Sequence, residues 1–459
     1  MNKFIKYNWL KVVLIFVFAL FFTGKGFEQK TSAQENNCDC APDEVIFELL
    51  SPANLPAVAA QYKLKQTPLG QVGVPPTYRM EIDRTVNTQT PLQIVAAMQA
   101  DARITKPEVN RKLSAAEREG LPWTIGHSWA VGHSWAVGGS VKGYNRQWFP
   151  DKIRLDEAHQ ISKGASVIIA VLDTGIDFNH PAFAGKLVPG YDFVDNDDNP
   201  SEVGVLRQGS YGHGTHVAGI IALTAPEAKI MPIRILKPDG SGELWQVTAA
   251  IIWAAQHGAD IVNISFGYPA NVRVLKDLID ACDDGITIDA KTFPEVGTRR
   301  LAVIAGAGNG ANTAKIYPAG EDLDGMLGVG ASTKYDLLAP FSSFNGQSGG
   351  DWVEIVAPGE NIVSAIPNGR YGTWSGTSMS APIISGIAAL VKSINPTITP
   401  DSLVDQVKET GVKIRYIDIQ RGEIKIRRVD ALCAVMNNQI CLAPTAAAND
   451  DGFEKFKLQ

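Results

Sequence analysis

Continuous apolar runs recur along the chain from residue 148 onward, and helical segments lie between several of them. The apolar runs cover residues 167–172, 231–236, 260–265, 301–307 and 326–331. The helical segments cover residues 213–223, 243–257 and 272–282. Runs that are apolar on both faces are typical of parallel strands in a covered sheet. The alternation predicts an α/β fold, namely a doubly wound, mostly parallel sheet with helices on both faces, and such sheets bind ligands at the carboxyl ends of their strands.

A shorter series of elements precedes this sheet. Strand-like and helical runs alternate in the order 44–50, 51–62, 78–82, 90–98 and 103–109. The second helix starts at Thr90-Pro91, a pair typical of a helix N-terminus. The order β-α-β-α-β predicts a small α+β domain over residues 38–113.

The first 33 residues have the features of a secretory signal peptide. Three lysines precede an apolar run at residues 12–22, which is too short to span a bilayer comfortably, and small or polar residues follow. We therefore expect residues 1–33 to direct export, which makes the protein secreted or extracytoplasmic. If the segment is not cleaved, it would anchor the protein in the membrane.

The two predicted domains are joined by residues 114–146, which are rich in Gly, Ala, Ser and Trp. This segment contains the tandem repeat Gly-His-Ser-Trp-Ala-Val, at residues 126–131 and again at 132–137. Two histidines without further ligands do not predict a metal site, so a flexible linker is the better interpretation. The main domain then covers residues 147–413, and a C-terminal extension covers 414–459.

Charge and cysteine content narrow the function classes. The 459 residues carry a formal net charge of -6, which argues against a nucleic acid or an anionic membrane surface as partner. The five cysteines show no metal-binding spacing. Cys433 and Cys441 could close a small disulfide loop in an exported protein, and the odd count leaves at least one cysteine unpaired in a monomer, the state we expect.

One helix should begin with a serine. Residues 383–391 are apolar on all sides, as in a helix buried within a large domain. Pro382 is expected in the first turn of that helix, where its missing N–H costs nothing. Ser378 would then lie at the helix N-terminus, where free N–H groups and the helix dipole can hold an oxyanion. Taken alone, a serine at this position is more often a simple helix cap.

Three further polar residues lie at the edges of predicted buried elements. Asp173 ends the first apolar strand, His213 opens a helix, and Asn309 follows the strand at 301–307. Each has an ordinary structural interpretation as a turn or cap residue. Together with Ser378 they supply what nucleophilic acyl transfer needs: a hydroxyl, an imidazole base, a carboxylate to orient it and an amide donor for the oxyanion.

These residues stand in motifs that resemble the subtilases, the subtilisin-like serine peptidases, and especially thermitase-like members. The motifs are Asp-Thr-Gly at residue 173, His-Gly-Thr-His at 213 and Gly-Thr-Ser-Met-Ser-Ala-Pro at 376, in the family's order. The resemblance covers roughly residues 148–411. It implies a triad of Asp173, His213 and Ser378, with Asn309 as an oxyanion donor and His216 outside the chemistry. It also implies polypeptide substrates and catalysis without a cofactor.

The resemblance extends to substrate binding. Gly240, Ser241 and Gly242, and likewise Ser265, Phe266 and Gly267, match the two backbone segments that enclose an extended peptide in the family. Such recognition is strand addition, in which main-chain hydrogen bonds give affinity and pockets give selectivity. Ile316 occupies the position of the first specificity pocket, where many relatives carry glycine. A shallow apolar pocket for small or medium side chains is therefore expected.

Calcium is a further expectation from the resemblance. Residues 190–199 are dense in carboxylate and amide oxygens, which calcium prefers, and a structural calcium held by Asp192, Asp195 and Asp197 is one interpretation. An acidic solvated loop is the alternative. The family's tighter calcium site is expected to be missing, because Ala182 stands where an aspartate is expected.

By element order and position, residues 38–113 resemble a subtilase propeptide, which assists folding and occupies the active cleft. A secreted serine endopeptidase made as a self-processing zymogen is therefore the leading hypothesis, with cleavage between residues 114 and 146 and the enzyme's own propeptide as a partner. The alternatives are a catalytically silent, subtilase-like binding protein and a dedicated processing protease of narrow specificity.

Overall fold

The computed structural model describes residues 39–115, 136–205, 209–287, 298–346, 351–438 and 454–455. The predicted signal peptide and nearly all of the tandem repeat lie outside these ranges. All described residues belong to one compact unit, residues 39–459.

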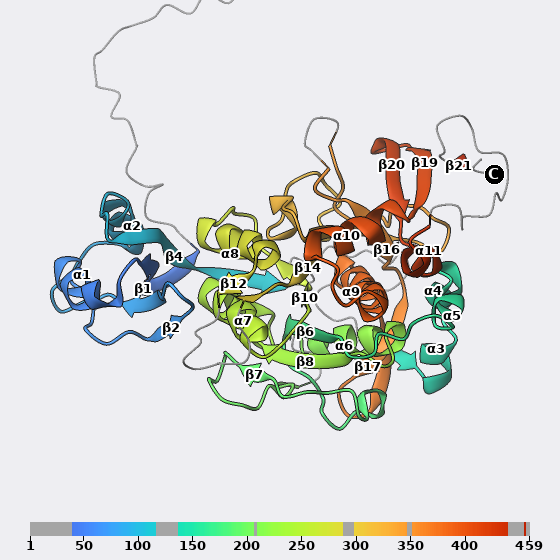
Figure 1. Cartoon of the computed structure of the whole chain (residues 1–459), viewed down its shortest axis with the longest axis horizontal. Coiled ribbons are helices and arrows are strands. Elements are labelled where there is room, and N and C mark those ends of the chain that lie inside the picture. Colours follow the sequence, from blue (N-terminus) through green and yellow to red (C-terminus); the bar gives the residue numbers. More distant parts are fainter. Residues whose placement is uncertain are drawn as a thin grey trace, which may run out of the picture. The chain divides into compact units, whose positions relative to one another are not determined.

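A central sheet carries the main domain (Figure 1). Its parallel strands are β6 (Ile168–Asp173), β8 (Lys229–Arg234), β10 (Ile261–Ile264), β14 (Ala302–Gly306), β15 (Met326–Ser332) and β16 (Ile355–Pro358). They lie in the order β16-β15-β14-β10-β6-β8, with β7 (Tyr191–Asp192) at one edge. The chain adds β8 on one side of β6 and then crosses to add β10 on the other side, so the strand order reverses at β6 and β10. The five predicted strands and the doubly wound sheet are confirmed.

Helices cover both faces of this sheet. They are α6 (His213–Thr224), α7 (Leu244–Gln256), α8 (Arg273–Asp284), α9 (Thr377–Ile394) and α10 (Pro400–Glu409). Successive strand residues face opposite sides. Ile261 of β10 packs in the core that holds α6, α9 and α10, whereas Val262 packs in the core that holds α7 and α8. Two-sided burial explains why the strands are mostly apolar.

Helix α9 is the longest of these helices and is buried along most of its length. Its residues from Thr377 to Val391 are all buried. Among the described residues, it is the single helix long and apolar enough to cross a membrane, but 83% of that apolar stretch lies inside the fold, as in a core helix. The prediction for Pro382 is wrong, because α9 begins at Thr377 and Pro382 lies inside the helix rather than in its first turn.

The N-terminal α+β part has the predicted order of elements, with one additional strand. It contains β1 (Cys40–Leu49), α1 (Leu55–Gln61), β2 (Gly70–Val72), β3 (Thr77–Glu81), α2 (Pro91–Met98) and β4 (Ile104–Ala115). Thr90 and Gln93 form a capping box that starts α2. Strand β4 is longer than predicted, and its last residues pair with β9 (Ser241–Glu243) and β11 (Phe266–Gly267) of the main domain.

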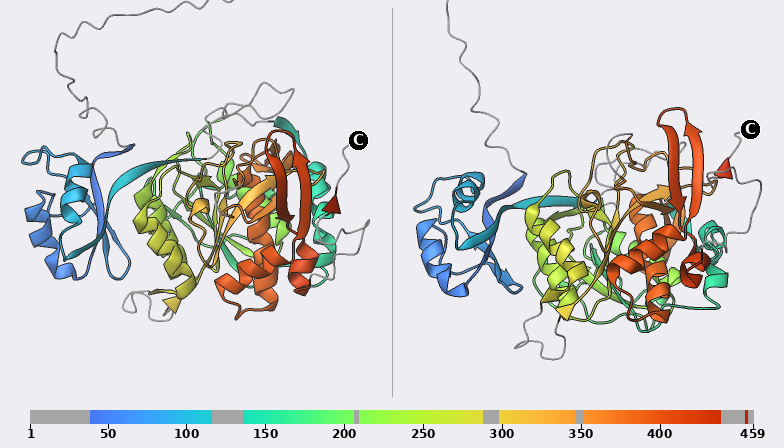
Figure 2. Two further views of the ribbon diagram at one scale, coloured as in Figure 1. Left: turned by 90° about the horizontal axis from the view of Figure 1, so that it is seen from above. Right: turned by 45° about the horizontal axis from the view of Figure 1, so that its top comes forward.

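The predicted linker and C-terminal extension are partly built into the main domain. Residues 136–145 form β5 (Ala136–Gly139) and α3 (Val141–Asn145), and β5 pairs with β18 (Arg370–Trp374), which also pairs with β17 (Ile362–Ile366). The ribbon of β19 (Val412–Asp418) and β20 (Gly422–Arg428) extends the central sheet through β16 (Figure 2). The remaining elements are α4 (Trp148–Lys152), α5 (Leu155–Ala158), β12 (Ile286–Thr287), β13 (Thr298–Arg299), α11 (Ala431–Met436) and β21 (Glu454–Lys455).

Three cysteines lie among the described residues. Cys433 is disulfide-bonded, and the pairing with Cys441 stays a prediction because Cys441 lies outside the described residues. Cys40 is also disulfide-bonded. Cys282 is free and buried.

Candidate active site

The predicted site residues come from ends of elements at one edge of the sheet. Asp173 is the last residue of β6, Ser265 directly follows β10, and Asn309 lies just beyond β14. His213 is the first residue of α6, and Ser378 is the second residue of α9. The carboxyl ends of parallel strands share an edge, and the reversal at β6 and β10 opens a crevice there. This is the location that the sequence predicts.

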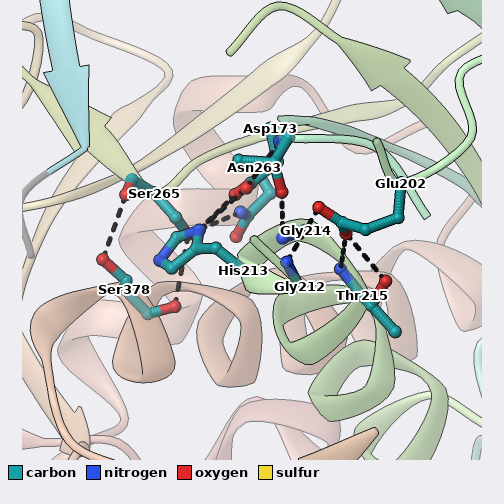
Figure 3. Close-up of polar contacts among 10 residues, drawn as sticks. Asp173, Glu202, Gly212, His213, Gly214, Thr215, Asn263, Ser265 and Ser378 are labelled. Carbon is teal, nitrogen blue, oxygen red and sulfur yellow. Dashed lines mark hydrogen bonds and ion pairs between the residues drawn. The ribbon is translucent and has the colours of Figure 1, made fainter. Parts of the chain in front are cut away.

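Asp173 and His213 form a buried hydrogen-bonded pair (Figure 3). The Nδ1 atom of His213 lies 2.7 Å from Oδ1 and 2.9 Å from Oδ2 of Asp173, and both side chains are 1% exposed. Asp173 Oδ1 also accepts from the Thr174 N–H at 2.8 Å. A carboxylate that binds Nδ1–H fixes the tautomer in which Nε2 can accept a proton.

Glycine at residue 214 allows this pair to form. A Cβ atom at Gly214 would lie 2.2 Å from the carbonyl oxygen of Gly175 and 3.0 Å from Cβ of Asp173. The first turn of α6 can therefore lie directly against the end of β6 only without a side chain at residue 214. Thr174 Oγ1 accepts from the Gly214 N–H at 2.9 Å and ties the two elements together.

Ser378 is fully buried and bonded to Ser265 in both directions. Its hydroxyl donates to the Ser265 carbonyl at 3.0 Å, and its own carbonyl accepts from Ser265 Oγ at 3.2 Å. In Figure 3 the imidazole of His213 lies between the Asp173 carboxylate and Ser378. The same ring is 5.6 Å, between centroids, from Trp374, which ends β18 shortly before α9 begins.

The side chain of Asn309 is oriented by the start of α9. Its Oδ1 accepts from the Thr377 N–H at 2.9 Å and from Thr377 Oγ1 at 3.2 Å. Thr377 Oγ1 in turn accepts from the Gly308 N–H at 3.0 Å. The amide group of Asn309 is planar. With its oxygen held against Thr377, its donating NH2 group points away from Thr377.

His216 stands apart from this chemistry, as the resemblance implies. Its ring stacks on Trp374 with centroids 4.7 Å apart, and Nε2 lies 3.3 Å from the Gly372 carbonyl oxygen. Burial lowers the pKa of His216 to about 3, so the ring is neutral at ordinary pH. Trp374 and Gly372 belong to β18, so the His216 ring packs α6 against that strand.

The two predicted substrate segments form β9 and β11, and the end of β4 lies between them. Leu113 pairs with Gly242, and Ser114 pairs with Ser241. On its other side β4 pairs with β11, where Ser114 faces Gly267 and Ala115 faces Phe266. Gly240 forms the turn before β9, with a φ angle of +79°. The chain thus places an extended peptide between the segments that the sequence singled out.

Ile316 packs against the backbone of both neighbouring segments. A Cβ atom at Gly267 would lie 2.3 Å from Ile316 Cγ2, and one at Gly308 would lie 3.0 Å from Ile316 Cγ1. The side chain of Ile316 therefore fills the space between residues 267 and 308, beside Asn309. The shallow apolar pocket expected from the sequence stays a prediction.

The expected calcium ligands are engaged by an arginine. The buried guanidinium of Arg234 contacts Asp192 Oδ2 and Asp195 Oδ2, each at 2.5 Å. Asp192 Oδ1 accepts the N–H groups of Val194 and Asp195, and Asp197 Oδ1 accepts that of Asn199. Within the described ranges, no group of three or more His, Cys, Asp or Glu side chains is arranged to hold a metal. These residues therefore do not fit a calcium site in this arrangement.

One residue beside the site was missed in the sequence. Glu202 accepts the N–H of Gly212 at 2.8 Å and the hydroxyl of Thr215 at 2.8 Å, so its carboxyl group lies at the start of α6 (Figure 3). Burial of this group, supported by the charge of Asp173, raises the pKa of Glu202 to about 7. A lone glutamate eleven residues before the histidine carries no motif signal.

Comparisons with known proteins identify the family. The model of the subtilase family matches residues 164–422. A thermophilic serine proteinase from Bacillus sp. (strain AK1) is 36% identical over 291 residues, which is 60% of this chain and 65% of that protein. Thermitase from Thermoactinomyces vulgaris is 34% identical over 282 residues, which is 58% of this chain and 91% of thermitase.

A solved structure shows the same fold. Fervidolysin from Fervidobacterium pennivorans, described as a keratinolytic enzyme related to subtilisin, superimposes with a TM-score of 0.65 at 23% identity. The match covers 88% of this chain and 62% of fervidolysin. The fold, the family match and these relatives agree, and the chain belongs to the subtilase family of serine endopeptidases.

Proposed function

We propose that the protein is a secreted serine endopeptidase, made as a zymogen, that cleaves peptide bonds through Asp173, His213 and Ser378. The observation that carries the proposal is the hydrogen bond from His213 Nδ1 to Asp173 at 2.7 Å, at the sheet edge where Ser378 begins α9. Asp173 and His213 are both buried in a site whose backbone segments accept an extended strand.

The chemistry follows from these positions. The Ser378 hydroxyl turns from the Ser265 carbonyl to Nε2 of His213, which takes the proton as the oxygen attacks the substrate carbonyl carbon. Asp173 stabilises the imidazolium that forms. The carbonyl oxygen becomes an oxyanion, held by the Asn309 amide and the Ser378 N–H. His213 then returns the proton to the leaving amine, and water hydrolyses the acyl-enzyme by the same steps.

Residues 39–115 act as the propeptide in this proposal. The end of β4 lies between β9 and β11, where a substrate strand would lie, and so it blocks the site. Ala115 faces Phe266, so a peptide that continues this register presents its next residue to Ser265, whose carbonyl is bonded to Ser378. In the sequence that residue is Ala116, followed by Glu117.

We therefore expect self-cleavage between Ala116 and Glu117, inside the range of residues 114–146. Alanine before the scissile bond suits the pocket that Ile316 fills, because a methyl side chain needs little depth. An extended peptide gains main-chain hydrogen bonds on both sides in this position, whatever its side chains.

The test is N-terminal sequencing of the exported protein, combined with labelling by a fluorophosphonate that reacts with activated serines. Wild type should be labelled and should begin at Glu117. Ser378→Ala should be unlabelled and should keep its residues 39–115. The matched control is Ser380→Ala, because Ser380 is also buried in α9 but donates to the Ala357 carbonyl at 3.0 Å. An unlabelled wild type, or a processed Ser378→Ala, would overturn the proposal.

A further inference from the structure

Helix α6 begins without a capping side chain of its own. Its N-cap is Gly212, with a φ angle of +89°, and no side-chain cap hydrogen bond comes from that residue. The first N–H groups of a helix have no partner within the helix, and leaving them buried and unbonded is costly. His213 is the first residue of this helix, so its position depends on what holds these groups.

Glu202 supplies the missing acceptor. Its Oε1 accepts the Gly212 N–H at 2.8 Å, and its Oε2 accepts the Thr215 N–H at 3.3 Å and the Thr215 hydroxyl at 2.8 Å. One carboxyl group thus binds the turn on both sides of His213 (Figure 3). An ionised carboxylate is also favoured at a helix N-terminus by the helix dipole.

Glu202 is fixed in turn to the strand that carries Asp173. Its backbone N–H donates to the Ile176 carbonyl at 2.9 Å, and Ile176 N–H donates to Pro200 at 3.0 Å. Gly175, which lies between Asp173 and Ile176 in the chain, has a φ angle of +111°. A Cβ atom at Gly175 would lie 2.6 Å from the Ser201 carbonyl oxygen. Glu202 therefore joins the end of β6 to the first turn of α6.

We propose that Glu202 is a positioning residue for the pair of Asp173 and His213. Its ionised carboxyl group holds the first turn of α6, and with it His213, in hydrogen-bonding reach of Asp173. This inference rests on the proposed function, in which Asp173 and His213 act together. Glu202 itself touches neither the substrate nor the reacting atoms.

The ionised form is needed because the groups that hydrogen-bond to the carboxyl oxygens, in Gly212 and Thr215, donate to them. When Glu202 takes up a proton, one of its oxygens carries a hydrogen that the N–H groups of Gly212 and Thr215 cannot accept. The ionisable groups that face Glu202 are Asp173 at the end of β6 and Tyr211 before α6, and Asp177 and Arg370 lie around Tyr211. The pKa of Glu202, about 7, places this change near neutral pH.

The stability of the fold and the alignment of His213 with Asp173 then respond to pH in opposite directions. The pKa of Glu202 is raised in the folded state, so its contribution to stability is full below the ordinary pKa of 4.5 and is lost as pH rises to about 7. Protonation of Glu202 thus favours the stability of the fold, whereas ionisation of Glu202 favours the alignment of His213 with Asp173. A residue with a merely structural role would move activity and stability together.

The experiment measures kcat, KM and melting temperature from pH 5 to pH 9. The protein is the mature enzyme obtained by self-processing of the full-length chain, and the substrate is a peptide anilide that ends in alanine. In wild type, activity requires neutral His213 and is further raised by ionised Glu202, so the acid limb of log kcat should be steeper than the slope of one that His213 alone gives. Glu202→Gln should lower kcat about tenfold at pH 8, leave KM within twofold and reduce that slope to one. Its melting temperature at pH 8 should not fall.

The matched control is Glu354→Gln. Burial also raises the pKa of Glu354 to about 7, but Glu354 binds the Gly328 N–H and Lys408, outside the site. This variant should keep the slope and kcat of wild type. If Glu202→Gln does not fold, Thr215→Val removes one donor to the same carboxylate and should lower kcat with KM unchanged.

A fluorophosphonate-labelled wild type together with a Glu202→Gln variant whose kcat and slope equal those of wild type would overturn this inference alone. The inference would also fail if Glu354→Gln changed the slope as much as Glu202→Gln does. An unlabelled, inactive wild type would overturn the proposed function instead.

Discussion

Ser265 and Ser378 are joined by two hydrogen bonds in opposite directions, one from each hydroxyl to the other's carbonyl oxygen. Pro382 leaves the Ser378 carbonyl without its usual donor within the helix. In an α-helix the N–H of residue 382 would donate to the carbonyl of residue 378, but proline has no N–H. The Ser378 carbonyl can therefore accept from Ser265 Oγ at 3.2 Å, and the start of α9 is tied to the end of β10.

Replacing Pro382 should raise the stability of the protein and lower its activity. Pro382→Ala restores an N–H that competes with Ser265 Oγ for the Ser378 carbonyl, and it removes a residue that costs a helix interior about 3 kcal/mol. We expect the free energy of unfolding to rise by about 1–3 kcal/mol and kcat to fall several-fold. Denaturant unfolding and peptide hydrolysis measure the two effects.

Ser265→Ala is the companion variant, since it removes the donor without adding a helical hydrogen bond. It should lower kcat without raising stability. A Pro382→Ala enzyme that is less stable than wild type would show that the proline is accommodated without cost in α9 and would contradict this account.

The preference for the residue before the scissile bond should respond to the size of residue 316. Ile316→Gly removes the side chain that packs against Gly267 and Gly308. We expect kcat/KM for peptides with phenylalanine before the scissile bond to rise about tenfold or more, since 1–3 kcal/mol is typical for filling an apolar pocket. Alanine peptides should gain little.

Ile316→Val is the control, because it shortens the side chain by one methyl group and should change the preference only slightly. Wild-type enzyme that already cleaves rapidly after phenylalanine or tyrosine in a peptide library would refute the shallow pocket.

The sheet, its covering helices and the positions of Asp173, His213 and Ser378 were predictable from the sequence. Apolar runs reveal strands that are buried on both faces of the sheet. A polar residue at the carboxyl end of such a run lies at the ligand-binding edge of the sheet, and this position does not depend on the conformation of the loops. The small α+β part was predictable for the same reason, since its alternation and the Thr90 cap are local signals.

What the sequence did not reveal depends on contacts between distant segments. Glu202 gains its role only because the loop after β7 returns to the end of β6. Arg234 meets Asp192 and Asp195 through the pairing of β7 with β8, which replaces the expected calcium arrangement. Pro382 was placed in the first helical turn because propensity favours it there, whereas tertiary packing starts α9 five residues earlier.

Docking of residues 39–115 should depend on the absence of a side chain at residue 70. A Cβ atom at Gly70 of β2 would lie 2.5 Å from Trp245 Cζ2 in the first turn of α7, next to the Asn110 side chain that accepts the Trp245 N–H. Gly70→Val should weaken docking by about 1–3 kcal/mol through overpacking. The full-length protein should then lose residues 39–115 faster after self-cleavage, which gel electrophoresis measures alongside the rise of peptide hydrolysis.

Gln71→Val tests the same strand at an exposed side chain and should activate at the wild-type rate. Equal activation of all three proteins would show that β2 contributes nothing to inhibition.

The last prediction concerns stability and pH at Glu354. This carboxyl group joins strand β15 to helix α10, since it accepts the Gly328 N–H at 3.1 Å and contacts Lys408 Nζ at 3.3 Å. Burial outweighs these partners and raises the pKa of Glu354 to about 7. Its stabilising contribution is therefore full below pH 4.5 and is lost as pH rises through 7.

Glu354→Gln is neutral at every pH and escapes this loss. Its melting temperature should exceed that of wild type at pH 8, and the difference should shrink towards pH 5. Glu423 is the control with the opposite sign, because Lys425 and Arg415 lower the pKa of this exposed side chain. Solvent screens such a pair, so Glu423→Gln should change the melting temperature little at either pH. A Glu354→Gln variant that is less stable than wild type at pH 8 would mean that the contact with Lys408 outweighs the cost of burying the charge.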